Sequence, residues 1–439
     1  PASLADTAIE PGDAKYARVR NTYLRGGAPG LVLQVRDAGQ VAEALAFARS
    51  QPVPLAVRSA GHGISGRSTN DGGIVIDLSR LNRIEVLDEG SRRVRIEPGA
   101  RWMDVATALA PHGLAITSGD YGGVGVGGLA TAGGVGYFAR EQGLTIDHVR
   151  RMHVVLADGT ELEVSDVEHP DLFWAMRGAG ANFGVVTSFE FEAHEGGDVG
   201  WAQLVFDASD PAGFLERWGR AIEAAPRSVT GQVILGSRIP GQPMLAQALI
   251  VVHESDPDAI VAALQPIADI APMLQQSVQL APYAAVMANV RGGYHEGRGE
   301  PLSRSGLIEH LTPEFSRAAA DVLDGGLSHF FSIRAVGGAV ADVPEDAMAY
   351  SGRSANFALA AMGSQREFAD AWRESLVPHS SGVYISFDTE DSDDVVERAF
   401  PPGKLARLRE LKWRYDPENV FRDNFNVLPR VPDQEPAAL

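Results

Sequence analysis

The stretch 118-SGDYGGVGVGGLATAGGVGY-137 holds nine glycines in twenty residues. Glycine loses more conformational entropy than any other residue when it enters a helix or a strand, so we expect neither element here. A flexible linker is also disfavoured, because Val124, Val126, Leu129 and Val135 are apolar and would be wasted in one. Successive free N–H groups of such a loop form a concave site for an anion such as a pyrophosphate. The stretch therefore predicts a diphosphate-binding loop.

The hexapeptide 123-GVGVGG-128 superficially matches the glycine fingerprint of dinucleotide-binding Rossmann domains. That fingerprint needs a strand before it, an amphipathic helix after it and an acidic residue at the end of the next strand. The sequence shows no clean strand before the glycines, no amphipathic helix after them and no such acidic residue. We therefore expect a loop of non-Rossmann type.

A second loop, 57-VRSAGHGISGRSTNDGGIVIDLS-79, carries a histidine directly after a predicted strand. Val53, Leu55 and Val57 alternate as in a strand packed on one side. Regular structure is predicted to stop at Ser59 and to resume at Ile74. Loops held at the end of a rigid strand often carry chemistry, which makes His62 a candidate functional residue. Without further motifs, a solvated loop histidine is the more common outcome.

Length and composition narrow the class of protein. A chain of 439 residues is too long for one core and predicts two or three domains. The formal net charge of −19 argues against nucleic acid or an anionic membrane as a partner. The absence of cysteine excludes disulfides, thiolate metal sites and a cysteine nucleophile. We expect no metal site either, because the eleven histidines are scattered without ligand spacing.

Targeting signals are also missing from the pattern. No apolar run approaches the length of a membrane span, and the first residues lack a basic start followed by a hydrophobic segment. We expect a cytoplasmic protein with no membrane partner, and the sequence leaves its oligomeric state open.

Along the chain, helices alternate with antiparallel pairs of strands, which favours an α+β fold. A hairpin is predicted over 149–165, with its turn at Asp158-Gly159. The pattern of residues along the sequence changes near 194–200. We therefore expect one domain over 1–195 and a second over 196–395. A C-terminal segment, 396–439, is expected to return to the first domain and to end in a frayed tail. The predicted strands are 31–35, 53–58, 73–79, 83–87, 93–97, 184–193, 245–254 and 328–340, and the predicted helices are 40–50, 101–112, 170–178 and 401–421.

Five stretches together resemble one known family. The two glycine loops are followed by 143-GLTIDHV-149, 173-FWAMRGAGANFGVVT-187 and 414-RYDPENVFRDNFNV-427, in the order and spacing of the FAD-linked oxidases of the vanillyl-alcohol-oxidase superfamily. Over nearly its whole length the chain resembles the berberine-bridge-enzyme-like branch, and its bacterial single-linkage members in particular. The resemblance implies a two-domain FAD-binding fold of PCMH type, with a substrate domain of antiparallel sheet and helices.

The resemblance also implies that FAD is attached covalently, through His62 only. At the His62 position the imidazole bonds to the 8α-methyl group of the isoalloxazine. Tyr121 stands where many relatives have a cysteine that forms a second link, and Leu129 stands where relatives often have histidine. The cofactor-binding residues implied in this way are Arg58, Ser59, Ala60, Gly61, His62, Gly63, Ser118, Gly119, Gly123, Val124, Gly125, Gly128, Leu129, Gly133, Gly134, Gly136, Val149, Val185, Tyr384, Asn424 and Asn426.

The reaction implied by the family is hydride transfer from a C–H bond next to oxygen or nitrogen of a small molecule to flavin N5, with dioxygen reduced to hydrogen peroxide. Tyr384, in 382-GVYISFD-388, matches a family strand that faces the active site. A core tyrosine is an equally good interpretation, and a phenol with a pKa near 10 needs help to act as a base. A flavin-dependent dehydrogenase, a monooxygenase and a silent flavin-binding protein remain alternatives.

The strand within 328-SHFFSIRAVGG-338 places Ser332 and Arg334 on one face, which in the family lines the substrate pocket. Arg334 stays protonated and is no base, but it could bind a carboxylate or phenolate, or stabilise a reduced flavin. A structural ion pair is the alternative. The amides of Asn424 and Asn426 could bond to the flavin or substrate, or simply close the helix-end turn. The catalytic candidates are Tyr384, Arg334, Ser332 and Asn426.

Overall fold

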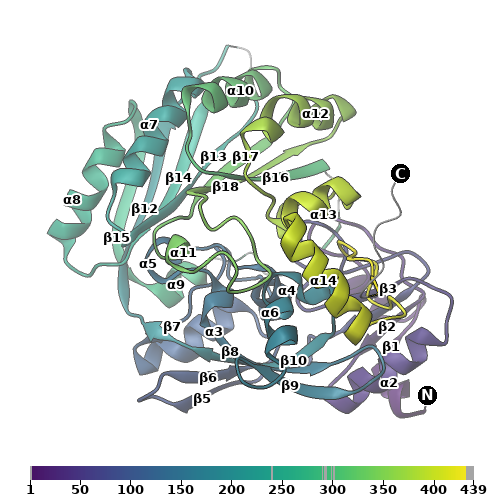
Figure 1. Ribbon diagram of the computed structural model, residues 1–439. Helices are drawn as coiled ribbons and strands as arrows, with labels where there is room; N and C mark the ends of the chain where they lie inside the picture. Colours follow the sequence, from purple (N-terminus) through teal and green to yellow (C-terminus); the bar gives the residue numbers. More distant parts are fainter. Residues whose placement is uncertain are drawn as a thin grey trace.

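The computed structural model describes residues 2–238, 241–288, 290, 294–297, 299 and 302–431. These residues form helices and three main β-sheets, which confirms the α+β class (Figure 1). Part of the C-terminal tail that we expected to be frayed, from residue 432 on, lies outside the described residues. No helix in the described ranges has the length and apolar character needed to cross a membrane.

The first sheet is built by the N-terminal segment and has the strand order β1-β2-β4-β3. Strands β2, β3 and β4 are parallel, because helix α2 carries the chain back over the sheet between β2 and β3. Asp37 caps α2 by accepting a hydrogen bond from the backbone N–H of Gln40. The elements are β1 (Ala8–Ile9), α1 (Tyr16–Val19), β2 (Leu31–Gln34), α2 (Ala38–Arg49), β3 (Leu55–Arg58) and β4 (Ile74–Asp77).

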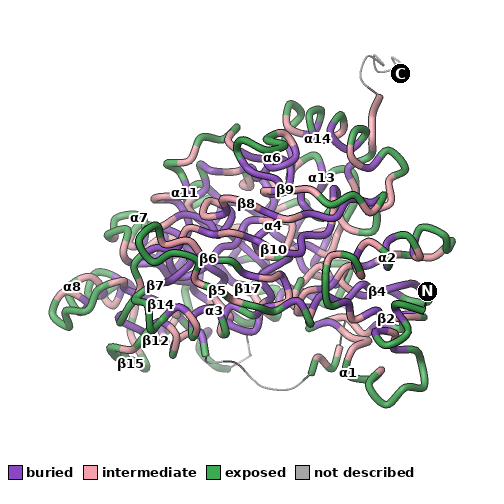
Figure 2. The backbone as a smooth tube through the Cα atoms, turned by 90° about the horizontal axis from the view of Figure 1, so that it is seen from below, coloured by how far each residue is buried: buried purple, intermediate pink, exposed green. Residues whose placement is uncertain are grey.

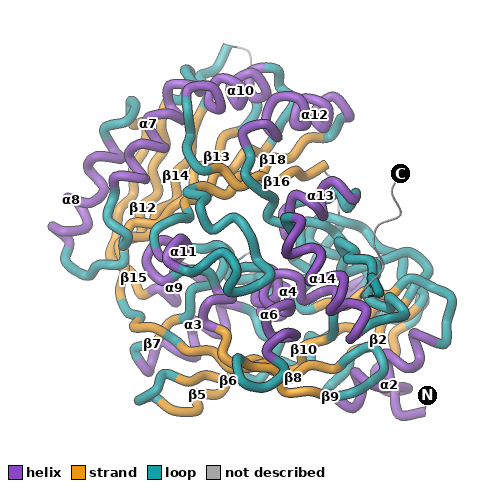
Figure 3. The backbone as a smooth tube through the Cα atoms, in the orientation of Figure 1, coloured by secondary structure: helices purple, strands orange, loops and turns teal. Residues whose placement is uncertain are grey.

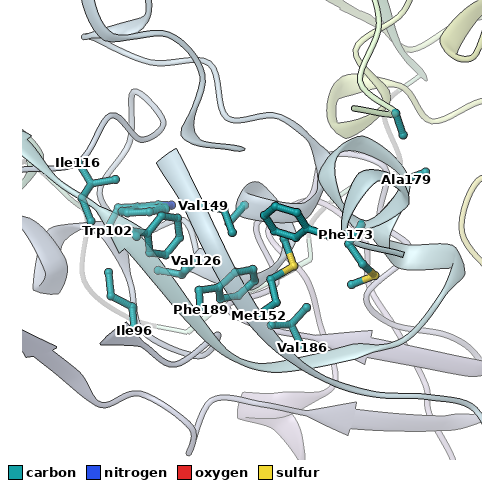
Figure 4. Close-up of a cluster of buried hydrophobic side chains, with 14 of the residues drawn as sticks. Ile96, Trp102, Ile116, Val126, Val149, Met152, Phe173, Ala179, Val186 and Phe189 are labelled. Carbon is teal, nitrogen blue, oxygen red and sulfur yellow. The ribbon is translucent and has the colours of Figure 1, made fainter. Parts of the chain in front are cut away.

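The second sheet has five antiparallel strands in the order β5-β6-β10-β8-β9. The predicted hairpin is confirmed, because β8 pairs with β9 across the Asp158-Gly159 turn. Trp102 of α3, Val126 of α4 and Phe173 of α6 pack with Met152 and Phe189 in a buried cluster (Figure 4). The elements are β5 (Ile84–Asp88), β6 (Arg93–Ile96), α3 (Trp102–Leu109), α4 (Val126–Ala132), α5 (Ala139–Gln142), β8 (Val149–Val155), β9 (Glu161–Ser165), α6 (Pro170–Ala179) and β10 (Val185–Glu192).

The third sheet has seven antiparallel strands in the order β15-β12-β14-β13-β17-β18-β16. Helices α7, α8, α10 and α12 cover one face of it, where Phe214, Trp218 and Phe315 are fully buried (Figure 1). The elements are β12 (Asp198–Asp207), α7 (Pro211–Ala224), β13 (Val229–Leu235), β14 (Leu245–Val252), α8 (Pro257–Ala268), β15 (Met273–Pro282), β16 (Leu302–Ile308), α10 (Pro313–Asp324), β17 (Phe330–Ala335), β18 (Phe357–Gly363) and α12 (Arg366–Ala371).

Shorter elements join the sheets. The loop around α11 lies between the upper and lower parts of the molecule, and Arg353 in it forms a buried ion pair of 2.7 Å with Asp147 (Figure 3). The C-terminal helix α14 returns to pack near α6. These elements are β7 (Leu114–Ala115), β11 (His194–Glu195), α9 (Tyr283–Met287), α11 (Ala339–Asp342), α13 (Asp393–Ala399) and α14 (Pro402–Tyr415).

Two sequence predictions of local structure are wrong. Helix α4 forms inside the glycine-rich stretch, because its first N–H groups bond to the carbonyl oxygens of Ala100 and Pro98 and its Val126 and Ala130 are buried. Tyr384 does not lie on a strand: it precedes a short 3-10 turn, Ile385–Phe387. Gly382, two residues earlier, makes an isolated bridge to Leu307.

The seven-stranded sheet begins with β12, just after the short β11 strand. On this basis we propose the domain limits 1–195 and 196–395, with 396–439 returning to the first domain. One large hydrophobic cluster supports the return, because Val396, Leu408 and Val427 pack in it together with Phe173 and Phe189.

Candidate functional site

His62 follows the end of β3 and is surrounded by aromatic rings. Its imidazole stacks on the ring of Tyr23, with ring centroids 5.0 Å apart, and meets His295 edge-on at 4.6 Å. The ring of Tyr121 lies 5.3 Å away. A Cβ added at Gly123 would stand 3.1 Å from His62 Nε2, so the glycine-rich stretch passes directly beside this nitrogen.

The surroundings keep the His62 imidazole neutral. Burial is the largest cause, and the nearby His295 and Arg101 add to it, lowering the pKa of His62 to about 3. A neutral imidazole has a lone pair on one ring nitrogen, which is the form that makes a covalent bond. Burial thus favours the form of His62 that keeps a lone pair on one ring nitrogen.

The loop that carries His62 is anchored on both sides. Arg58, the last residue of β3, forms a buried ion pair with Asp77 at the end of the neighbouring β4, with 2.9 Å between Nε and Oδ2. Ser59 donates its hydroxyl to the carbonyl oxygen of Pro98. At Gly125 a Cβ would overlap the side chain of Ser59 and crowd the backbone N–H of Ala60. The two glycine loops named from the sequence are thus in contact.

The second half of the glycine-rich stretch packs just as closely. A Cβ at Gly136 would overlap the carbonyl oxygen of Ser118, so the start and end of the stretch touch backbone to backbone. The backbone N–H of Gly134 donates to the hydroxyl of Tyr384 at 3.0 Å. Tyr384 is buried, and this burial raises the pKa of its phenol. The structure therefore brings Tyr384 to the stretch, as an acceptor for its backbone.

A buried polar network faces the stretch from the seven-stranded sheet. Arg334 of β17 donates from Nε to Asp120 Oδ2 at 2.6 Å and from Nη1 to Ser332 Oγ at 3.2 Å. Ser332 in turn donates to Gln232 of β13 at 3.3 Å, and Gln232 bonds to Tyr137. Burial raises the pKa of Tyr137. The chain itself thus supplies the carboxylate partner of Arg334, which is the ion pair that the sequence left as an alternative.

The C-terminal return is held by a buried lysine. Lys412 of α14 donates from Nζ to Asp416 Oδ2 and to the carbonyl oxygens of Asn182 and Phe421, at 2.7 to 2.8 Å. The Asn182 side chain accepts the backbone N–H of Val427 at 2.9 Å. These contacts fix both ends of the segment 421–427.

The same segment is tied to the His62 strand and carries the two predicted amides. The Asp423 carboxylate accepts the backbone N–H of Leu55 at 2.9 Å, and Phe425 adopts a left-handed φ of 45°. The Oδ1 atoms of Asn424 and Asn426 are buried without a hydrogen-bond partner among the described residues. A buried acceptor without a donor costs free energy, so these oxygens point to a missing donor.

These features fit FAD. A flavin ring offers an N–H donor to an amide oxygen, and the neutral His62 nitrogen fits a bond to the ring. Gly128 would meet nothing within 4 Å if it carried a Cβ, so that part of the stretch faces open space. The structure places Val149 and Val185 in hydrophobic clusters of the core, and their role beside the cofactor stays a prediction.

Among the remaining predicted residues, Leu129 lies close to Gly119: a Cβ added at Gly119 would be 3.1 Å from the Leu129 side chain. Gly133 lies beside the Tyr384 ring. Gly61 has a left-handed φ of 71°, and Gly63 and Val124 lie in the same loops. Their contacts with FAD stay predictions as well.

Sequence reasoning missed three polar residues of the network: Asp120, Tyr137 and Gln232. A signal existed for Asp120, because it is the single charged residue in the stretch 118–137. The other two lie at ordinary positions, and only their burial beside Arg334 and Ser332 singles them out.

Comparisons with known proteins place the chain in a family. Residues 29–165 match the family model of an FAD binding domain, and residues 383–427 match the berberine and berberine-like family model. The (R)-6-hydroxynicotine oxidase of Paenarthrobacter nicotinovorans is 31% identical over 459 aligned positions, which cover 98% of each chain.

Solved structures agree. The crystal structure of 6-hydroxy-D-nicotine oxidase from Arthrobacter nicotinovorans superimposes with a TM-score of 0.86 at 27% identity, covering 98% of this chain and 99% of that one. The glucooligosaccharide oxidase of Acremonium strictum shares the fold, with a TM-score of 0.83 at 22% identity over 98% and 99% of the two chains. The chain therefore belongs to the berberine-bridge-enzyme-like branch of the FAD-linked oxidases, and it is an oxidoreductase with a PCMH-type FAD-binding domain.

Proposed function

We propose that this protein is an FAD-dependent oxidase of a small organic substrate and that its FAD is attached covalently to His62 alone. When bound, FAD would supply the acceptor for a hydride from a C–H bond next to oxygen or nitrogen, and dioxygen would take up the electrons as hydrogen peroxide. The (R)-6-hydroxynicotine oxidase relative supports an oxidase with a small-molecule substrate.

The observation that carries the proposal is the position of His62. Its imidazole stacks on Tyr23 and lies beside Gly123, and burial lowers its pKa. The glucooligosaccharide oxidase of A. strictum carries a 6-S-cysteinyl, 8α-N1-histidyl FAD, and our chain has Tyr121 but no cysteine for the first of these links. A single histidyl link is thus the form that this sequence permits.

The polar network on the sheet has the groups needed to handle a substrate proton. Arg334 remains a cation, and burial keeps the phenols of Tyr137 and Tyr384 protonated by raising their pKa values. Within this network the carboxylate of Asp120 accepts a hydrogen bond from Arg334 Nε at 2.6 Å. We propose that Asp120 also accepts a hydrogen bond from the substrate's hydroxyl or amine group, with Arg334 orienting its carboxylate.

Acid precipitation of the purified holoenzyme tests the attachment. We expect the yellow colour to stay with the pellet and the His62 peptide to gain the mass of one FAD. His62→Ala should release its flavin into the supernatant, whereas His112→Ala, a control histidine bound to Glu89 at the surface, should keep it. Flavin released from the unaltered protein would remove the covalent role of His62.

Substrate screening tests the reaction. Peroxide release is measured with hydroxylated N-heterocyclic amines, oligosaccharides, phenols and alcohols. Peroxide from any class supports an oxidase. Flavin that is bleached without peroxide indicates a dehydrogenase, incorporation of oxygen into the product indicates a monooxygenase, and flavin that no compound reduces indicates a silent binder.

A further inference from the structure

Strand β15 is an unguarded edge of the seven-stranded sheet. Within the part of the chain that the structure describes, β15 pairs only with β12, and its other side ends the sheet (Figure 1). Residues 274–280 are all exposed, as the green tube at β15 shows (Figure 2). Three of them are large apolar side chains: Leu274, Val278 and Leu280 are 51%, 43% and 46% exposed. An exposed, apolar edge of this length is a site for pairing with another strand.

Between its two ends, β15 lacks the usual protections of an edge strand. Natural edges are kept apart by shortness, charged side chains, proline or a bulge. This strand has ten residues, 273-MLQQSVQLAP-282, with no charge and with its proline at the last position. Its one register shift against β12 lies at the Met273 end, so the edge beyond it is regular.

The absence of charged side chains on β15 also indicates which partner strand pairs with it. The chain has a net charge of −19, so two copies repel each other over most of their surfaces. At β15 no like charges come together, and an uncharged strand offers nothing that would select a charged partner. A second copy of the same strand is complementary by symmetry, since an antiparallel pair can lie across a two-fold axis.

Register shows how the apolar side chains would meet. Gly200 and Ala202 of β12 lie opposite Leu280 and Val278, and Ile260 of α8 covers Gly200, where a Cβ would be 2.6 Å from Ile260 Cγ2. Leu280 and Val278 thus point to the helix side of the sheet, just beyond the cover of α8. The register shift next to Met273 interrupts this alternation before Leu274.

We propose that this protein forms a two-fold dimer in which β15 pairs antiparallel with β15 of the partner subunit, centred on Ser277, so that the two seven-stranded sheets become continuous. In this register Val278 lies diagonally across the two-fold axis from Val278 of the partner subunit. The two paired edges also gain backbone hydrogen bonds along their length.

Light scattering after size exclusion gives the first test. The holoenzyme should elute with twice the chain mass of 46.7 kDa. Val278→Lys places a charge at the centre of the pair and should give a monomer with unchanged flavin content. The matched control Val167→Lys changes another exposed valine, far from the sheet edge and 78% exposed, and should remain a dimer.

Engineered cysteines test the register itself, and the chain has no cysteine of its own to interfere. Opposed residues of an antiparallel pair have Cα atoms about 4.5–5.5 Å apart, within the range that a disulfide spans. Ser277→Cys should therefore form a cross-linked dimer under mild oxidation. Gln275→Cys should not, because its copies lie roughly 13 Å apart along the paired strands.

Each outcome decides the proposal. A monomeric wild-type protein at its highest soluble concentration overturns it. So does a dimer that persists in Val278→Lys while Ser277→Cys stays unlinked, because the interface must then lie elsewhere. If Val278→Lys does not fold, the cysteine pair alone gives the answer.

Discussion

The two walls of the candidate site are built in opposite ways. The FAD-domain wall consists of glycine loops in which backbone touches backbone, as Gly136 does at Ser118 and Gly125 does at the Ser59 loop. The substrate-domain wall is a sheet face that presents buried polar side chains, with Arg334 and Ser332 at its centre. The first wall depends on glycines, which carry no side chain, and the second on polar side chains that hydrogen-bond to one another.

The largest effect is expected where the glycine wall is broken. Gly136→Ala would drive its Cβ into the Ser118 carbonyl oxygen, and overlap with backbone costs at least about 3 kcal/mol of unfolding free energy. We expect loss of soluble, flavin-loaded protein. The control is Gly403→Ala, at the start of α14, whose Cβ meets nothing within 4 Å. Equal yields and melting temperatures for the two variants would contradict the packing argument.

The sheet wall should be destabilised by loss of a charge, whereas the glycine wall is destabilised by added volume. Asp120→Asn leaves Arg334 buried without its carboxylate, and such a change costs roughly 3 kcal/mol or more. Removing both charges in Asp120→Asn/Arg334→Gln should recover part of this loss. Urea unfolding of the two single variants and the double variant measures the coupling energy. A double variant as unstable as the sum of the singles would show that the pair contributes nothing.

The stability of the protein should depend on pH through His194, which lies where the two proposed domains meet. His194 on β11 is buried, and burial lowers its pKa from 6.5 to about 3, with His148 and His253 nearby. Between these pH values the unfolded chain binds a proton that the folded chain does not, so stability present above pH 6.5 is lost as the pH falls toward 3.

Between pH 7 and pH 5, His194 should account for a loss of about 2 kcal/mol. The glutamine introduced by His194→Gln cannot bind a proton, so the free energy of unfolding of this variant should fall by about 2 kcal/mol less than that of the wild-type protein. Urea unfolding at both pH values gives the comparison, and parallel losses in the two proteins would rule out His194 as the cause.

The smallest effect is expected where one wall donates to a side chain of the other. Tyr384→Phe removes the hydroxyl that accepts the Gly134 N–H, which costs about 1–2 kcal/mol for a buried donor left without a partner. Thermal unfolding measures the loss, and an unshifted melting temperature would mean that Gly134 finds another acceptor.

Much of the local structure could be predicted from the sequence. The strand that ends before Ser59, the resumption at Ile74 and the Asp158-Gly159 hairpin follow from alternation and turn chemistry, which act within a few residues. Composition also limits the chemistry: without cysteine, a cysteinyl link to the flavin at the Tyr121 position is excluded. His62 could be singled out because its motif occurs together with four other motifs in the order and spacing of a known family.

Only the tertiary structure decided the rest. Helix α4 forms among glycines because residues 98–100, distant in sequence, accept its first N–H groups, and a Cβ at Gly127 would come 2.9 Å from Pro98 Cβ. Asp120 meets Arg334, more than two hundred residues later, because the sheet packs over the glycine-rich stretch. Turn and strand patterns are local and can be recognised along the chain. A buried charge, its partner and its pKa depend on which distant segments exclude water around it, and that is settled only when the chain has packed.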